Sequence, residues 1–267
     1  MGVLSGPVID CHCHVYPAKI AEKATAGTAL FYETKPIGLD GTLEMLLAEN
    51  QKAGITRSLI SSVATTGKQV HSANRFLAEC ARLHPESITA MGTLYPGSED
   101  QAADVEEAIA LGVCAIKLHP DIQGFALDDP RCMRIFELCE GRLPVLLHTG
   151  DYRYDYSNPD RLLRVLRAFP KLPCIAAHFG SYTIWQRAEE LFGQENLWVD
   201  CSSSMPFLSD GRIVELIRSF GAERVLFGTD YPMWHPQQEL ERFLSLPLSK
   251  EEKELVLHKN AEKLFHL

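Results

Sequence analysis

The sequence predicts an α/β protein that folds as a (β/α)8 barrel, or TIM barrel, in a single domain over residues 1–267. Two observations predict this fold: short apolar runs alternate with longer amphipathic segments along the whole chain, and eight such units can be counted. Alternating strands and helices usually form parallel sheets with right-handed crossovers, and eight units are enough to close a barrel. An open doubly wound sheet is the alternative. The chain has no GxGxxG after its first strand and no GxxxxGK[ST], so the usual nucleotide-binding reasons for the open sheet are missing.

The expected elements follow one another regularly. Strands are expected at about 8–13, 55–63, 88–94, 113–118, 144–148, 173–178, 196–201 and 223–228. Helices are expected at about 42–53, 68–83, 99–111, 131–140, 160–168, 183–192, 211–219 and, in two pieces, 237–258. Asp129-Pro130 and Asn158-Pro159 each place a capping residue before a proline at the first helical position. The long segment Val15–Gly41 is expected to be a loop that forms a lid over the barrel mouth.

Composition excludes several classes of function. Hydrophobic residues make up 46% and charged residues 23% of the chain, as in ordinary globular enzymes. The formal net charge of −9, without clustered Lys and Arg, argues against nucleic-acid or anionic membrane partners. No apolar run reaches the roughly eighteen residues that a membrane span needs, and Met1–Pro7 lacks the features of a secretory signal. We therefore expect a cytoplasmic protein with reduced cysteines and a small-molecule substrate, and homo-oligomerisation stays open.

Two histidines at the end of the first expected strand indicate half of a metal site. Because strand side chains alternate between faces, His12 and His14 should project to the same side, where two imidazoles can bind one ion. The same alternation should send Cys11 and Cys13 to the opposite face, so we expect both cysteines to pack in the core rather than to bind zinc.

Ionisable residues also follow the later strands, at the barrel end where active sites form. These residues are Lys117, His119, His148, His178 and Asp230. Their convergence at one barrel mouth would leave several buried polar groups without a partner unless a metal, water or substrate bound them.

Three sequence motifs carry a family resemblance. They are His148-Thr149-Gly150, Ala177-His178-Phe179-Gly180 and Gly228-Thr229-Asp230-Tyr231-Pro232. With the first-strand histidines and the closing segment Asn260–Phe265, they resemble the amidohydrolase superfamily, and in particular its amidohydrolase-related branch. The resemblance covers essentially the whole chain. It implies a TIM-barrel enzyme in which a divalent metal ion, commonly zinc, is bound by His12, His14, His148 and Asp230. It also implies that His178 lies beside the ion as a catalytic or further metal-binding group.

Lys117 has three open interpretations. In some binuclear members of the superfamily a lysine at this strand is carboxylated and bridges two metal ions, so one or two ions are to be considered. A substrate-binding ammonium and a structural ion pair are the alternatives. We expect His119 to line the substrate pocket and Asp10 to act as a buried hydrogen-bond partner. Arg153 is a candidate clamp for a substrate carboxylate, although a solvated surface turn explains its segment equally well.

Metal-dependent hydrolysis is the first functional expectation. An ion held by imidazoles and one carboxylate lowers the pKa of bound water towards about 7. Asp230 would then take the proton from the attacking water and deliver it to the leaving group of an amide, lactone or ester, while His178 stabilises the developing oxyanion. The resemblance also implies an alternative, non-oxidative decarboxylation of an aromatic or unsaturated carboxylic acid, although many such decarboxylases are longer chains. A non-catalytic metal-binding protein is the third interpretation.

Overall fold

A computed structural model describes residues 6–267, so the first five residues, part of the segment in which no secretory signal was recognised, lie outside it. Its strands are β1 (Ile9–His14), β2 (Arg57–Ser61), β3 (Ile88–Ala90), β4 (Gly92–Thr93), β5 (Ile116–Leu118), β6 (Val145–Leu147), β7 (Cys174–Ala176), β8 (Leu197–Asp200) and β9 (Val225–Leu226). Neighbouring strands pair in parallel, in the orders β1-β2-β3 and β4-β5-β6-β7-β8-β9. Every expected strand is present, and the expected strand at 88–94 contains both β3 and β4.

The two sheets are continuous across β3 and β4. Met91 stands between these strands, and its N–H donates to Ile60 O of β2 at 2.8 Å. The N–H of the next residue, Gly92, donates in the other direction, to Ala115 O at 2.8 Å. One extended segment therefore joins both sheets.

The other edges of the sheets meet at the end of β1. Asp230 N–H donates to His12 O at 2.8 Å, and His14 N–H donates to Tyr231 O at 2.7 Å. Cys13 also forms a parallel bridge with Tyr231. These bonds bring the first and last strands together, so the predicted (β/α)8 barrel is confirmed.

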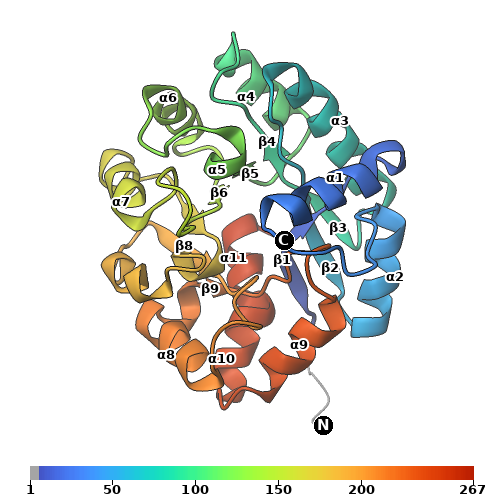
Figure 1. The fold of residues 1–267 in the computed structure, drawn as a ribbon, viewed down its shortest axis with the longest axis vertical. Coiled ribbons are helices and arrows are strands. Elements are labelled where there is room, and N and C mark those ends of the chain that lie inside the picture. Colours follow the sequence, from blue (N-terminus) through green and yellow to red (C-terminus); the bar gives the residue numbers. More distant parts are fainter. Residues whose placement is uncertain (1–5) are drawn as a thin grey trace.

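Helices surround the barrel (Figure 1). They are α1 (Ala18–Phe31), α2 (Leu43–Ala53), α3 (Gly67–Leu83), α4 (Gln101–Ala110), α5 (Pro120–Gln123), α6 (Pro130–Cys139), α7 (Pro159–Ala168), α8 (Asp210–Phe220), α9 (Pro236–Ser245), α10 (Lys250–Glu254) and α11 (Asn260–Phe265). Shorter turns are the 3-10 segments η1 (His178–Gly180), η2 (Trp185–Leu191) and η3 (Ala222–Arg224) and the π-helical turn η4 (Leu255–Lys259). Asp129 caps α6 as expected, with its side chain accepting from Arg131 N–H. In the described part of the chain, no helix is both long and apolar enough to cross a membrane.

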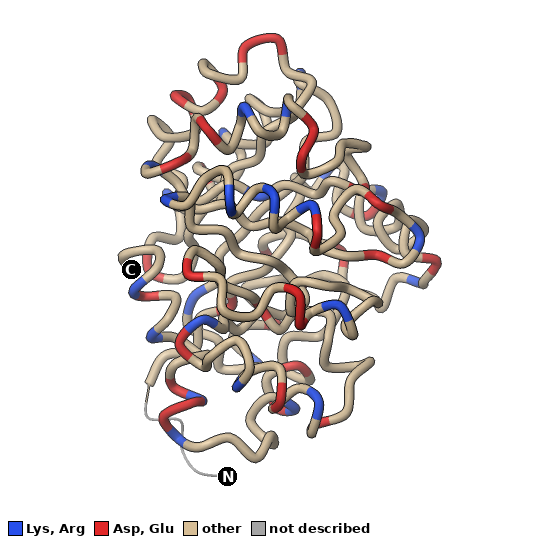
Figure 2. Tube along the Cα trace, turned by 90° about the vertical axis from the view of Figure 1, so that its left-hand side faces the viewer, with Lys and Arg blue, Asp and Glu red and all other residues tan. Residues whose placement is uncertain are grey.

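The barrel interior and the helix layer form separate hydrophobic clusters. Every strand unit of the barrel contributes to the interior cluster. Its strand residues are Ile9, Cys11, Leu59, Met91, Ala115, Leu146, Ile175, Ala177 and Leu226, and Trp198 packs against them. Ala261 and Phe265 of α11 join this cluster. The larger cluster fills the space between strands and helices. Acidic and basic residues are interspersed along the chain outside these cores (Figure 2).

Two expected elements differ in the structure. Val15–Gly41 is not a loop throughout, because α1 occupies fourteen of its residues. The buried positions of α1 are the small residues Ala21, Thr25 and Ala29, so the helix lacks the stripe of large apolar residues by which amphipathic helices are recognised. The segment expected as a helix at 183–192 forms the 3-10 turns of η2 instead.

Candidate metal centre and active-site cavity

His12 and His14 reach the barrel mouth through an irregularity in β1. The pairing register of β1 with β2 shifts between Asp10 and Cys13. Cys11 packs in the interior cluster, whereas Cys13 packs in the helix-side cluster. Both cysteines are buried, as expected, but Cys11 does not lie on the opposite face from the histidines. A β-bulge explains this, because it places two consecutive residues on one side of the strand.

Three of the predicted ligands meet at one point. The Nε2 atoms of His12 and His14 are 3.2 Å apart, and Asp230 Oδ1 lies 3.5 Å from the first and 3.4 Å from the second. All three side chains are buried, and each offers one ligand atom within 4.8 Å of the others. We call His12, His14 and Asp230 the primary cluster.

Asp200 orients the first of these imidazoles, and sequence reasoning missed it. Its Oδ2 is 2.9 Å from His12 Nδ1, and its Oδ1 accepts from His178 N–H and Ser202 N–H, each at 3.0 Å. This carboxylate holds the proton on His12 Nδ1 and leaves the lone pair of Nε2 facing the primary cluster. A signal was available, because Asp200 ends β8 as the other polar residues end or follow their strands.

Lys117 points at the same lone pair. Its ammonium donates to His12 Nε2 at 3.0 Å, and the side chain is fully buried. Burial lowers the pKa of Lys117 to about 8. A cationic group thus already contacts one of the three convergent ligand atoms.

His148, the fourth predicted ligand, belongs to a neighbouring group. Its ring stacks on that of His119 with centroids 4.0 Å apart, and its Nε2 lies 3.7 Å from Asp121 Oδ2. His148 Nδ1 is 3.1 Å from His178 Nε2. His178 in turn donates from Nδ1 to Ser202 O at 2.9 Å. We call His119, Asp121 and His148 the secondary cluster, and His178 connects it to the primary cluster.

The electrostatic environment favours neutral imidazoles beside an ionised carboxylate. Burial lowers the pKa of several histidines, namely His119, His148 and His178. Burial and the nearby Lys117 lower the pKa of His12 to about 4. For Asp230, burial acts to raise the pKa, but the surrounding histidines outweigh it and hold the pKa well below its usual value. Neutral imidazole and carboxylate are the forms that bind metal ions.

The backbone at this rim is strained where the sequence motifs lie. His178, Ser203 and Asp230 have positive φ angles of 60°, 47° and 60° although none is glycine. The glycine of the His-Thr-Gly motif, Gly150, has φ +76°, and a Cβ there would lie 2.7 Å from the backbone of Ser181. The motifs therefore specify an unusual backbone path that aims the polar side chains inward.

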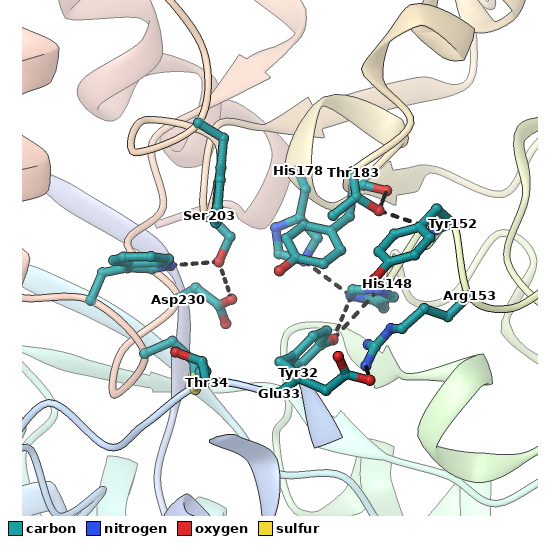
Figure 3. A pocket seen from close by; sticks show the side chains of 14 residues that line it. Tyr32, Glu33, Thr34, His148, Tyr152, Arg153, His178, Thr183, Ser203 and Asp230 are labelled. Carbon is teal, nitrogen blue, oxygen red and sulfur yellow. Dashed lines mark hydrogen bonds and ion pairs between the residues drawn. The ribbon is translucent and has the colours of Figure 1, made fainter. Parts of the chain in front are cut away.

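A cavity leads from the surface down to these residues (Figure 3). Tyr182, Phe207 and Trp234 form part of its wall, and His148, His178 and Asp230 lie at its base. Asp230 Oδ2 accepts from Ser203 Oγ at 2.5 Å, and Trp234 Nε1 donates to the same Oγ at 2.8 Å. Aromatic rings thus form part of the cavity wall, and buried polar groups lie at its base.

A comparison with protein families places the chain in one of them. Residues 9–267 match the profile of the amidohydrolase family. The chain belongs to the amidohydrolase family. Among curated proteins, none matches its sequence.

Solved structures similar to this amidohydrolase family member share its fold. An uncharacterised TIM-barrel protein from Bordetella bronchiseptica is 23% identical, with a TM-score of 0.81 over 98% of this chain and 99% of that one. A 5-carboxyvanillate decarboxylase from Novosphingobium aromaticivorans, in complex with manganese and 4-hydroxy-3-methoxy-5-nitrobenzoic acid, is 18% identical, with a TM-score of 0.80 over 100% and 98%. A dihydroxybenzoic acid decarboxylase from Polaromonas, with manganese and 2-nitroresorcinol, is 16% identical, with a TM-score of 0.74 over 98% and 97%.

These alignments extend over nearly the whole length of the two decarboxylase chains. We expected decarboxylases to be longer chains with larger insertions. The alignment instead covers 98% of the 5-carboxyvanillate decarboxylase chain.

The residues of this amidohydrolase family member fit a divalent metal ion. In the primary cluster, two imidazole lone pairs and one carboxylate oxygen converge in a buried site. Lys117 donates to one of these acceptor atoms, His12 Nε2, whereas a divalent ion would satisfy all three. Asp200 provides the carboxylate–histidine support that metal-binding imidazoles usually have.

Arg153 lies at the rim with its guanidinium already engaged. Its Nε and Nη2 pair with the two carboxylate oxygens of Asp151 at 2.9 and 2.6 Å, and its Nη1 donates to Phe31 O. The guanidinium also lies 5.4 Å from the ring centre of Tyr32. These contacts fix the end of α1 against the loop after β6, so Arg153 has a structural role beside its predicted one as a carboxylate clamp.

Proposed function

We propose that this protein is a metal-dependent decarboxylase of small aromatic carboxylic acids, the alternative raised by the sequence. The observation that carries the proposal is a cavity with aromatic walls that adjoins a second cavity lined by Lys117, His12 and His14. Tyr182, Phe207 and Trp234 suit an aromatic ring, and Lys117 suits a carboxylate. The named decarboxylases with the same fold support this choice.

In this proposal His12, His14 and Asp230 hold the ion, while His148, predicted as a fourth ligand, lies in the neighbouring secondary cluster. A bound divalent ion would supply a Lewis acid that draws electron density from the substrate oxygens. The sequence led us to expect zinc, and a donor set of imidazole and carboxylate accepts zinc or manganese. Because two of the similar structures contain manganese, we propose manganese, as a single ion.

Asp230 carries the proton in the proposed reaction. Its carboxylate is ionised at rest, because the nearby histidines hold its pKa low. It accepts the proton of a hydroxyl group ortho to the substrate carboxylate and passes that proton to the ring carbon. The new C–H bond forms with an electron pair of the phenolate ring. The bond between this carbon and the carboxylate then breaks, and its electron pair restores the aromatic ring. The products are carbon dioxide and a phenolate, which regains a proton from water.

The neighbouring side chains orient the substrate. Lys117 binds the carboxylate as an unmodified ammonium rather than as a bridging carbamate. His119 lines the pocket as predicted from its position after β5. His178, neutral and fixed through Ser202 O, holds a substrate oxygen.

Hydrolysis is the second candidate, because an ionised Asp230 is equally suited to deprotonate water. The two reactions are separated by their products. Protein loaded with manganese is incubated with 2,6-dihydroxybenzoate and 5-carboxyvanillate, and separately with a panel of aryl lactones, esters and amides. We expect carbon dioxide and the matching phenol in equal amounts, no turnover of the panel, and loss of activity in Asp230→Asn. Asp210→Asn, an exposed carboxylate of α8, is the matched control. Acid release from the panel without carbon dioxide would establish hydrolysis instead.

A further inference from the structure

Two adjoining cavities meet at the candidate active site. The first, with aromatic walls, has a volume of about 310 Å³, and the second, beneath α1, about 370 Å³. They share the side chains of Tyr32, His148, His178, Asp230 and Met233. Each volume is near the lower end of the roughly 300–1,000 Å³ range of ligand pockets.

Tyr32 is the shared residue that comes from α1 rather than from the barrel rim. It follows the last residue of α1, and its hydroxyl lies 2.6 Å from His119 Nε2 and 3.4 Å from His148 Nδ1. Its ring packs edge-on against Tyr182, with centroids 5.4 Å apart. Figure 3 shows the phenol reaching towards His148.

The segment that carries Tyr32 is held in place from outside. Arg153 donates to Phe31 O and pairs with both oxygens of the Asp151 carboxylate. Phe31 stacks on Tyr154 with centroids 5.4 Å apart and planes 9° from parallel. Tyr32 is therefore a fixed wall between the two cavities.

The second cavity has a different wall and its own opening. Ala24, Gly27 and Thr28 of α1 line it, with Lys117 on its inner side. Gly27 is exposed, and a Cβ built on it would meet no atom within 4 Å. A side chain added at Gly27 would thus enter open space at this opening without displacing its neighbours.

We propose that Tyr32 is a specificity-determining residue that limits the substrate to a single aromatic ring, by narrowing the passage from the first cavity to the second. This inference rests on the proposed decarboxylase function. The first cavity receives the ring, and the reacting carboxylate extends past the shared residues to Lys117 in the second cavity. Acids with two fused rings need space on both sides of Tyr32, so they are rejected.

The test compares one-ring and two-ring ligands in variants that open or refill this space. The substrates are 2,6-dihydroxybenzoate and a hydroxynaphthoate, and the readout is the ratio of their kcat/KM values with manganese-loaded protein. We expect Tyr32→Ala to shift this ratio at least tenfold towards the hydroxynaphthoate, and Tyr32→Phe, which keeps the ring, to leave it unchanged. Adding Gly27→Leu to Tyr32→Ala should reverse at least half of the shift on a logarithmic scale. An unchanged ratio in a folded Tyr32→Ala protein would overturn the proposal.

Binding separates this inference from the proposed reaction. The dissociation constants of 2-nitroresorcinol and 2-nitro-1-naphthol are measured by calorimetry in the same variants. If no variant releases carbon dioxide, the decarboxylase proposal fails. The size limit is supported when Tyr32→Ala shifts the ratio of the two dissociation constants at least tenfold towards the naphthol. It is refuted when this ratio is the same as in the wild type.

Discussion

Replacing Asp200 with Asn tests how the metal centre is organised. Asp200 Oδ2 lies 2.9 Å from His12 Nδ1, so the carboxylate holds a proton on that nitrogen. An amide NH2 group at the Oδ2 position donates a hydrogen bond to His12 Nδ1, whereas the carboxylate oxygen accepts one. The proton of His12 then moves to Nε2, the atom that faces His14 and Asp230 at 3.2 and 3.5 Å. We expect Asp200→Asn to remove the lone pair that binds the ion while leaving the ligands themselves unchanged.

The expected loss of metal affinity can be taken from other metal sites, in which residues that hydrogen-bond to the ligands have been removed. Their loss typically weakens metal affinity about 10- to 100-fold, which corresponds to about 1.4–2.8 kcal/mol of binding free energy. Competition with a fluorescent chelator gives the manganese dissociation constant, and circular dichroism of the metal-free protein checks the fold. Glu239→Gln is the matched control, since it also replaces a buried carboxyl group by an amide but lies outside both clusters. Equal manganese affinity in wild type and a folded Asp200→Asn variant would refute the reasoning.

Three further predictions concern residues around this centre. Burial raises the pKa of Glu239 from its usual 4.5 to about 8, so the stability of the fold is highest below about pH 4.5 and falls as pH rises towards 8. Measured by urea unfolding, the free energy of unfolding should fall less between pH 5 and pH 8 in Glu239→Gln than in wild type, by on the order of 3 kcal/mol. Equal falls in both proteins would contradict this. Lys117→Met should weaken 2,6-dihydroxybenzoate binding about tenfold or more, the cost of losing a hydrogen bond between charged groups, and calorimetry giving equal affinity would exclude Lys117 as the carboxylate partner. Gly150→Ala should lower the free energy of unfolding by about 2–4 kcal/mol, because φ is positive there and the added Cβ would lie 2.7 Å from the backbone of Ser181. Gly27→Ala, at an open position, should be neutral or slightly stabilising. Similar stability of both variants would contradict the argument.

The fold was predictable because strand and helix alternation leaves a local record in the sequence. Several strands of the barrel interior are short apolar runs that lead to a polar residue at the active rim, as Val145–Leu147 leads to His148. Helix α1 was missed because its buried face consists of Ala21, Thr25 and Ala29. Residues this small give no amphipathic period, and the packing of α1 over the mouth depends on tertiary contacts that a local pattern does not contain.

The sequence was enough to predict which strand ends contribute residues to the candidate site, but not how these residues are arranged. Position after a strand was enough to bring together His12, His14 and Asp230. The same rule applied to Asp200, but it lay within the expected strand at 196–201 and was counted as part of that strand. The bulge that places Cys11 inside the barrel has no sequence signature, because its geometry depends on pairing with β2. The separation of His148 from the primary cluster likewise depends on packing against His119 and Asp121.

The location of a bound ion tests the central claim most directly. Crystals of the protein grown with manganese are measured at the manganese absorption edge, and an anomalous difference map shows where the ion lies. We predict one strong peak in contact with His12 Nε2, His14 Nε2 and a carboxylate oxygen of Asp230, with Asp200 bonded to His12 Nδ1. A strong peak at His119 and Asp121 instead, or no peak at the barrel mouth with manganese in excess, would contradict the account.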